Sequence, residues 1–153
     1  MTDNRDRVAV LMGGWTSEAA VSRVSASFCG QAARNAGWDA VELEVDRDIA
    51  LHLKEMKPSR VFNALHGQVG EDGNIQGLLN ILNIPYTHSG LLASAIAMDK
   101  VLAKTLLAGG GIMVPPTLPL IEDSHAYPEE KCGAYVIKPR NDGSSFGVVI
   151  VPD

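Results

Sequence analysis

The chain has 153 residues, of which 46% are hydrophobic, so it can form one domain or two small ones with an ordinary core, and its composition argues against disorder. Its net charge is −5, from 13 Lys and Arg against 18 Asp and Glu, and it lacks basic clusters, so we expect no general nucleic-acid binding. The polar segment Met1–Arg7 does not resemble a secretory signal, and no apolar run reaches the ~18 residues of a membrane span, so we expect a soluble cytoplasmic protein that binds no membrane.

The first hundred residues alternate between strand-like and helix-like segments, which is typical of βαβ units and a parallel sheet. The apolar run in Arg7–Met12 predicts a buried strand that ends at Gly13-Gly14, and a helix follows it. The later predicted elements are strands at 40–45, 61–65 and 85–87, and helices at 49–56, 75–82 and from Ser89 or Gly90 to about 107. We therefore expect an α/β fold.

The helix after the first strand has a distinct apolar pattern. Thr16 or Ser17 can cap its beginning, and Gly37 is a typical end. Helical spacing predicts a core-facing apolar surface formed by Val21, Val24, Phe28 and Ala32.

The two cysteines, Cys29 and Cys132, lie far apart in apolar surroundings and match no metal-binding spacing. We expect both to be reduced core residues, as in cytosolic proteins.

The pattern changes after Gly109-Gly110-Gly111. Two strand-like runs, 134–138 and 146–151, flank a glycine-serine turn and predict a hairpin. The composition suggests an α/β domain over 1–100 and the beginning of a second domain over 101–153. A lone hairpin with one helix buries little apolar surface, so we expect either a longer protein or a partner chain to complete this second domain.

Two polar segments follow strands at the edge where parallel sheets bind ligands. Glu18 follows Gly13-Gly14 and could either complement a helix dipole or hold a substrate cation such as an amino group. His66 begins a glycine-rich loop that also contains Glu71 and Asp72. The histidine could be an ordinary hydrogen-bonding residue or a functional one, and the loop has no recognisable metal-ligand spacing.

Two lysines complete the candidate site. Lys138 ends an apolar strand just before Gly143-Ser144-Ser145, and a lysine beside a glycine-serine turn is suited to holding phosphate. A plain hairpin turn is the alternative interpretation. Lys100 follows Met98-Asp99 on a predicted helix, where a lysine is by default a solvated surface residue.

Taken together, these segments resemble the D-alanine–D-alanine ligase family of the ATP-grasp superfamily. The resemblance covers nearly the whole chain but only about the first half of such an enzyme. The motifs that carry it are Gly13-Gly14, Ser17-Glu18, Val21-Ser22, His66-Gly67, Gly70-Glu71-Asp72-Gly73, Gln76-Gly77, Ile84-Pro85-Tyr86-Thr87, Ser89-Gly90, Ala93-Ser94-Ala95, Met98-Asp99-Lys100, Lys138-Pro139, Gly143-Ser144-Ser145 and Gly147-Val148.

The resemblance implies a Rossmann-like, pre-ATP-grasp first domain followed by the beginning of an ATP-grasp domain. It implies that ATP phosphorylates the carboxylate of one D-alanine and that the amine of a second attacks the acyl phosphate, giving D-alanyl-D-alanine for peptidoglycan (cell-wall) synthesis. It also implies Mg²⁺ or Mn²⁺, held by residues outside this chain, and a homodimer. Because the metal ligands and a catalytic arginine of the family come from the other half, we expect residues 1–153 alone to be inactive.

Site roles follow from the resemblance position by position. Glu18 would hold the ammonium of the first D-alanine and bond to Ser144; these are the two implied catalytic residues. Val21 would contact the substrate methyl group, and His66 would bind the substrate carboxylate. The implied ATP-binding residues are Lys100, Lys138, Ser144 and Ser145.

Two alternatives remain open. One is another ATP-grasp ligase that joins a different carboxylate and amine. The other is a non-catalytic module for ligand binding or dimerisation.

Overall fold

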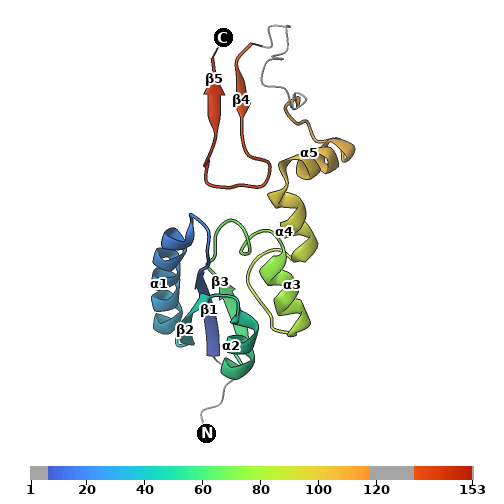
Figure 1. Cartoon of the computed structure of the whole chain (residues 1–153). Coiled ribbons are helices and arrows are strands. Elements are labelled where there is room, and N and C mark those ends of the chain that lie inside the picture. Colours follow the sequence, from blue (N-terminus) through green and yellow to red (C-terminus); the bar gives the residue numbers. More distant parts are fainter. Residues whose placement is uncertain (1–6, 118–132, 153) are drawn as a thin grey trace.

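The computed structural model describes residues 7–117 and 133–152, and the prediction for Cys132 lies outside them. Its first part is a three-stranded parallel sheet with helices on both faces, which confirms the predicted α/β fold (Figure 1). The strands are β1 (Arg7–Gly13), β2 (Asp39–Val45) and β3 (Arg60–Asn63), and β1 lies in the centre. Val8 on β1 is in register with Ala40 on β2 and Arg60 on β3.

The two faces of the sheet are covered by different helices. Alternate residues of β1 point to opposite faces, so Val8 and Val10 pack with Ala26 of α1 (Ala19–Asn35). Ala9 and Leu11 pack on the other face, against α2 (Ile49–Met56) and α3 (Asn74–Ile81). Cys29 is a free, half-buried thiol beside the first of these clusters.

The prediction of which face of α1 packs against the sheet is wrong. The four predicted residues are exposed instead, Phe28 by 75% of its surface; they are Val21, Val24, Phe28 and Ala32. The buried residues of α1 are all small: Ala19, Ser22, Ala26 and Gly30. Small side chains let the helix approach the sheet closely, so size rather than hydrophobicity selects the buried face.

The beginning of α1 also differs from the prediction. Glu18 occupies the position before the helix, and no side chain caps the helix there, neither Thr16 nor Ser17. The carbonyl of Thr16 accepts the N–H of Ala19, and its hydroxyl accepts the N–H of Glu18 at 3.3 Å. These contacts hold Glu18 in a tight turn directly after β1. At the other end, Gly37 adopts φ +91° and ends the helix as predicted.

The segment between α3 and the hairpin departs twice from the prediction. Pro85–Thr87 forms only an isolated parallel bridge, between Tyr86 and Val61. The predicted helix to about residue 107 is two helices, α4 (Leu91–Met98) and α5 (Lys100–Gly109). Asp99 separates them because its extended backbone and its carboxylate, which accepts two N–H groups of the next turn, begin a new helix.

The predicted hairpin is confirmed. It consists of β4 (Tyr135–Ile137) and β5 (Val149–Val151), which pair antiparallel, with Tyr135 opposite Val151. Its closed end points toward the first part of the chain and lies beside α4 and α5 (Figure 1). Among the described residues, no helix is long and apolar enough to cross a membrane.

Ser22 joins the ends of β1 and β3. Its fully buried hydroxyl accepts the N–H of Gly13 at 2.9 Å and donates to the carbonyl of Ala64 at 2.8 Å. We expect Ser22→Ala to lower the free energy of unfolding by about 1–3 kcal/mol, because both backbone groups then lose a buried partner. Denaturant titration measures the difference.

Ser27→Ala is the matched control for Ser22→Ala, because Ser27 is an exposed serine on the same helix. It should change the free energy of unfolding by no more than about 0.5 kcal/mol. Equal effects of the two substitutions would show that the hydroxyl of Ser22 does not stabilise this junction.

Candidate functional site

The strand order places the candidate site at the centre of the sheet. From β1 the chain crosses one face through α1 to reach β2, and it then crosses the other face through α2 to reach β3. The chain also leaves β3 for α3 on the face opposite α1, so the connections diverge at the carboxyl ends of β1 and β3, where open α/β sheets form a ligand crevice. Glu18 follows β1 and His66 follows β3, so both lie at this edge.

Glu18 contacts two segments that are distant in sequence. Its Oε1 accepts a hydrogen bond from the hydroxyl of Ser144, across 126 residues. Its Oε2 lies against Gly67, where an added β-carbon would be only 2.1 Å away. Gly67 also has φ +68°, a conformation that favours glycine. The close approach of Glu18 to the His66 loop therefore depends on a glycine at position 67.

His66 is half-buried, and its Nε2 lies 3.1 Å from the hydroxyl of Ser25 on α1. Sequence reasoning did not identify Ser25, although its spacing held a signal. Glu18, Val21 and Ser25 are three and four residues apart, and residues so spaced share one face of a helix. Val21 is 59% exposed on that face. Glu18, Val21, Ser25 and His66 thus line the same edge of the sheet.

Two carboxylates of the His66 loop bind its own backbone. Glu71 Oε2 accepts the N–H of Gly67 at 2.7 Å. Asp72 accepts the N–H of Val69 at 2.9 Å and that of Asn74 at 3.1 Å. These carboxylates therefore fix the shape of the loop and the start of α3.

Two buried side-chain amides, to which sequence reasoning assigned no role, hold the His66 loop through hydrogen bonds. Asn63 and Gln76 both donate to the carbonyl of Gly70, at 2.8 and 2.7 Å. Asn63 Oδ1 also accepts the N–H of Leu65. Two sequence signals pointed to them: Gln76 belongs to a motif of the family resemblance, and both are polar side chains in otherwise apolar stretches, where burial requires a hydrogen-bonding partner.

The second half of the candidate site lies around the hairpin turn. A cavity of about 180 Å³ is lined by both lysines, Lys100 and Lys138, and by Ser144 and Ser145. Lys100 is the first residue of α5, and its Nζ donates to the carbonyl of Asp142. The two serines have φ values of +49° and +58°, which non-glycine residues rarely adopt. The structure thus brings the two predicted lysines and the predicted serine turn together.

Arg140, at the start of this turn, pairs with Asp99. Its Nη2 and Nε lie 2.6 and 2.8 Å from Asp99 Oδ2. The Arg140 hydrogen bond, with help from the N–H groups of Leu102 and Val101, lowers the pKa of Asp99 from 3.8 to about 2. The carboxylate is therefore charged at neutral pH.

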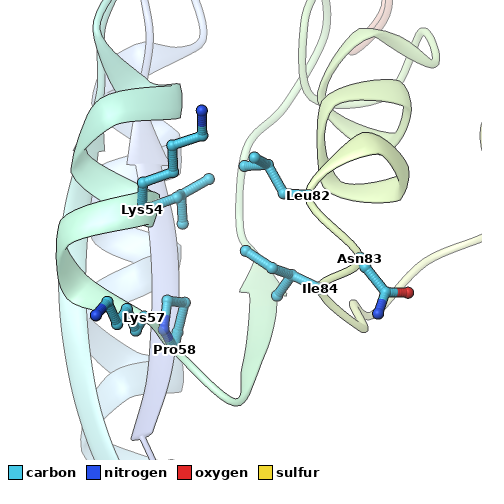
Figure 2. Close-up of a pocket in the computed structure, with 7 residues that line it drawn as sticks. Lys54, Lys57, Pro58, Leu82, Asn83 and Ile84 are labelled. Carbon is cyan, nitrogen blue, oxygen red and sulfur yellow. The ribbon is translucent and has the colours of Figure 1, made fainter.

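A second cavity, of about 270 Å³, lies between the ends of α2 and α3 (Figure 2). Apolar side chains form much of its wall, and no carboxylate is among its lining residues. Pro58, two residues before the start of β3, lines it, so this cavity opens near the amino end of the strand. It is therefore distant from the edge that carries Glu18 and His66.

No group of three metal-ligating His, Cys, Asp or Glu side chains forms within residues 7–117 and 133–152.

Comparisons with known proteins agree with this geometry. A family model described as "D-ala D-ala ligase N-terminus" matches residues 40–89. The D-alanine–D-alanine ligase of Bartonella bacilliformis is 50% identical over 144 residues, which cover 94% of this chain and 47% of the relative. D-alanine–D-alanine ligase B of Brucella suis is 49% identical over 146 residues, 95% of this chain and 47% of that protein. This chain is similar to the D-alanine–D-alanine ligases.

Solved structures of the family extend the likeness to three dimensions. The Bacillus anthracis D-alanine–D-alanine ligase superimposes with a TM-score of 0.82 at 35% identity, over 96% of this chain and 49% of that one. The same enzyme in complex with ATP gives a TM-score of 0.77 at 33% identity, over 96% of this chain and 50% of that one. The chain thus spans about half the length of its D-alanine–D-alanine ligase relatives.

Proposed function

We propose that this chain is the first half of an ATP-dependent ligase that joins two D-alanines through an acyl phosphate for peptidoglycan synthesis. The observation that carries the proposal is the contact between Glu18 and Ser144, which joins the sheet edge to the hairpin turn. It sets a carboxylate next to a cavity lined by two cations. Carboxylate activation by ATP needs this combination, an anion to hold an amino acid and cations to hold phosphate.

The sheet edge forms the proposed D-alanine side. The carboxylate of Glu18 attracts the substrate ammonium, and the exposed Val21 offers an apolar contact to its methyl group. His66, held by Ser25, donates to the substrate carboxylate. Such fixed partners orient the reacting carboxylate toward the hairpin turn, and orientation of this kind lowers the activation barrier.

The hairpin turn forms the proposed ATP side. Lys100, Lys138 and the hydroxyls of Ser144 and Ser145 suit phosphate oxygens, because ammonium and hydroxyl groups donate hydrogen bonds to them. ATP supplies the phosphoryl group that activates the carboxylate. Closure of the turn over the cavity would exclude water from the activated substrate. The described residues do not group carboxylates suited to Mg²⁺ or Mn²⁺.

Two further proposals concern the domain division and the location of the protein. The helix break at Asp99 supports a domain division at residue 100, with the beginning of an ATP-grasp domain after it. The similarity to D-alanine–D-alanine ligases supports small-molecule substrates, and we propose that the protein acts in the cytoplasm.

The decisive experiment is an assay of ADP and phosphate release with ATP and D-alanine, using the protein expressed from its complete coding sequence. We expect D-alanine-dependent ADP release and D-alanyl-D-alanine as the product. Residues 1–153 alone should release no phosphate, and robust turnover by them would contradict our division of the site between two halves.

The same assay separates the alternatives. ADP release with D-lactate or an L-amino acid, but not with D-alanine alone, would identify a different ATP-grasp ligase. Binding of D-alanine without turnover by the complete protein would favour a non-catalytic module.

We also propose a homodimer through α1. Val24 and Phe28 are exposed large apolar side chains on one helix face, an arrangement that favours a protein contact. We expect sedimentation to detect a dimer and Phe28→Asp to shift it toward monomer, since a carboxylate in an apolar interface is costly. A monomeric wild-type protein would rule the dimer out.

A further inference from the structure

The carboxylate of Asp99 serves two parts of the structure with its two oxygens. Oδ1 accepts the N–H groups of Val101 and Leu102, both at 3.0 Å, and so begins α5. Oδ2 accepts both nitrogens of the Arg140 fork. Asp99 is only 8% exposed although its partner is largely exposed. One side chain therefore ties the start of a helix to the hairpin turn.

Lys100 reinforces this attachment from the next position. Its backbone N–H donates to the carbonyl of Arg140 at 3.2 Å. Its Nζ donates to the same carbonyl at 3.4 Å and to the carbonyl of Asp142. Arg140 is thus held through both its side chain and its backbone.

Because Arg140 lies between Lys138 and Ser144 in the chain, its attachment also restrains these two residues. Arg140 is two residues after Lys138 and four before Ser144, so fixing it limits where both can lie. The contact between Ser144 and Glu18 attaches the turn at a second point. Two attachments restrain a segment far more than one, because a single point still allows it to rotate.

We infer that Asp99 and Arg140 are positioning residues that dock the hairpin turn on the junction of α4 and α5 and hold Lys138, Ser144 and Ser145 in place before nucleotide binds. The inference rests on the proposed function for the identity of the nucleotide. Ordering the turn in advance reduces the entropy lost on binding, so the pair strengthens ATP binding without touching ATP.

The other ion pairs among the described residues join two parts of the first domain and do not reach the hairpin. Arg34 also pairs with Glu42 through two nitrogens, at 3.0 and 2.9 Å, but both partners lie on the first domain. Arg34 is near the end of α1, far along the helix from Glu18. It is a matched control, since breaking its pair removes the same chemistry without releasing the hairpin.

The test compares Arg140→Gln, Asp99→Asn and the double variant in the protein from its complete coding sequence. Asn keeps an oxygen to accept the α5 N–H groups but loses the charge that attracts Arg140. We expect each single variant to raise the KM for ATP about 3- to 10-fold, with kcat and the KM for D-alanine changed less than about 2-fold. The double variant should be no worse than either single one.

Amide hydrogen exchange provides a readout that is independent of catalysis. The amides of Lys100, Phe146 and Val148 donate to the carbonyls of Arg140, Gly143 and Ser145. Without nucleotide, they should exchange about 3- to 10-fold faster in Arg140→Gln than in wild type, and Arg34→Gln should not change them. Arg140→Lys keeps the charge but loses the fork, so we expect intermediate exchange.

The inference would be overturned by unchanged exchange in Arg140→Gln, by an equal effect of Arg34→Gln, or by additive effects in the double variant. A change in kcat with no change in the KM for ATP would also contradict it. The proposed function fails separately, by absence of D-alanine-dependent ADP release from wild type, and the exchange comparison would still decide the docking role.

Discussion

Glu18→Gln should lower kcat/KM for D-alanine by about 10²- to 10³-fold in the protein from its complete coding sequence. Glutamine has nearly the same shape and keeps an oxygen for the hydroxyl of Ser144, but it lacks the charge that attracts an ammonium group. The loss should therefore fall mainly on D-alanine and little on the KM for ATP. Steady-state kinetics with each substrate varied in turn measures both.

Two comparisons define this result. Glu44→Gln makes the same chemical change at an exposed carboxylate paired with Arg23, and it should leave the kinetics unaltered. Ser144→Ala removes the hydroxyl but keeps the charge of Glu18, so we expect a smaller loss of about 10-fold. If Glu18→Gln raised only the KM for ATP, the ammonium-binding role would be wrong.

Gly67→Ala should reduce activity about 10²-fold while costing the fold only about 1 kcal/mol. The new methyl group would overlap Glu18 Oε2, which lies at the end of a flexible side chain and can move away. The fold therefore tolerates the clash, but Glu18 leaves its place beside Ser144. The backbone strain of alanine at φ +68° accounts for the small loss of stability.

Gly37→Ala separates the strain from the clash. Gly37 has φ +91°, and a β-carbon there would meet no atom within 4 Å. We expect a similar loss of about 1 kcal/mol in the free energy of unfolding, with full activity. Thermal or denaturant unfolding and kcat/KM should be measured on both variants. Equal activities of the two alanine variants would show that Gly67 does not determine the position of Glu18.

The order of strands and helices could be predicted from the sequence because it depends on local patterns. The apolar run that ends at Gly13-Gly14 correctly indicated β1, the strand predicted at 40–45 matches β2, and α2 was predicted with its observed bounds. The packing of α1 could not be predicted in the same way. Its largest apolar residues form a regular stripe, but the sheet accepts the small residues of another stripe, and hydropathy does not record that preference.

The helix break had a signal that apolar content concealed. Asp99 is an efficient helix-capping residue within an otherwise continuous apolar segment, so the pattern alone suggested one long helix.

The single residues of the candidate site could be predicted from the sequence, but the contacts between them could not. Residue type and position after a strand indicated Glu18 and His66. That the hydroxyl of Ser144 reaches Glu18, 126 residues away, depends on how the hairpin turn sits on the first part of the chain. No local pattern encodes such a placement. Ser25 was missed for a related reason, since it acts through His66 and is an ordinary helix serine in sequence.

The size of the side chains on the buried face of α1 affects the position of Glu18 at the candidate site. Ser22 and Ala26 face the sheet, and both are fully buried. A bulkier residue at either position would push α1 away from the sheet and move Glu18 away from the strand ends. On this inner side of the helix, even one added methylene would widen the crevice that D-alanine is proposed to enter.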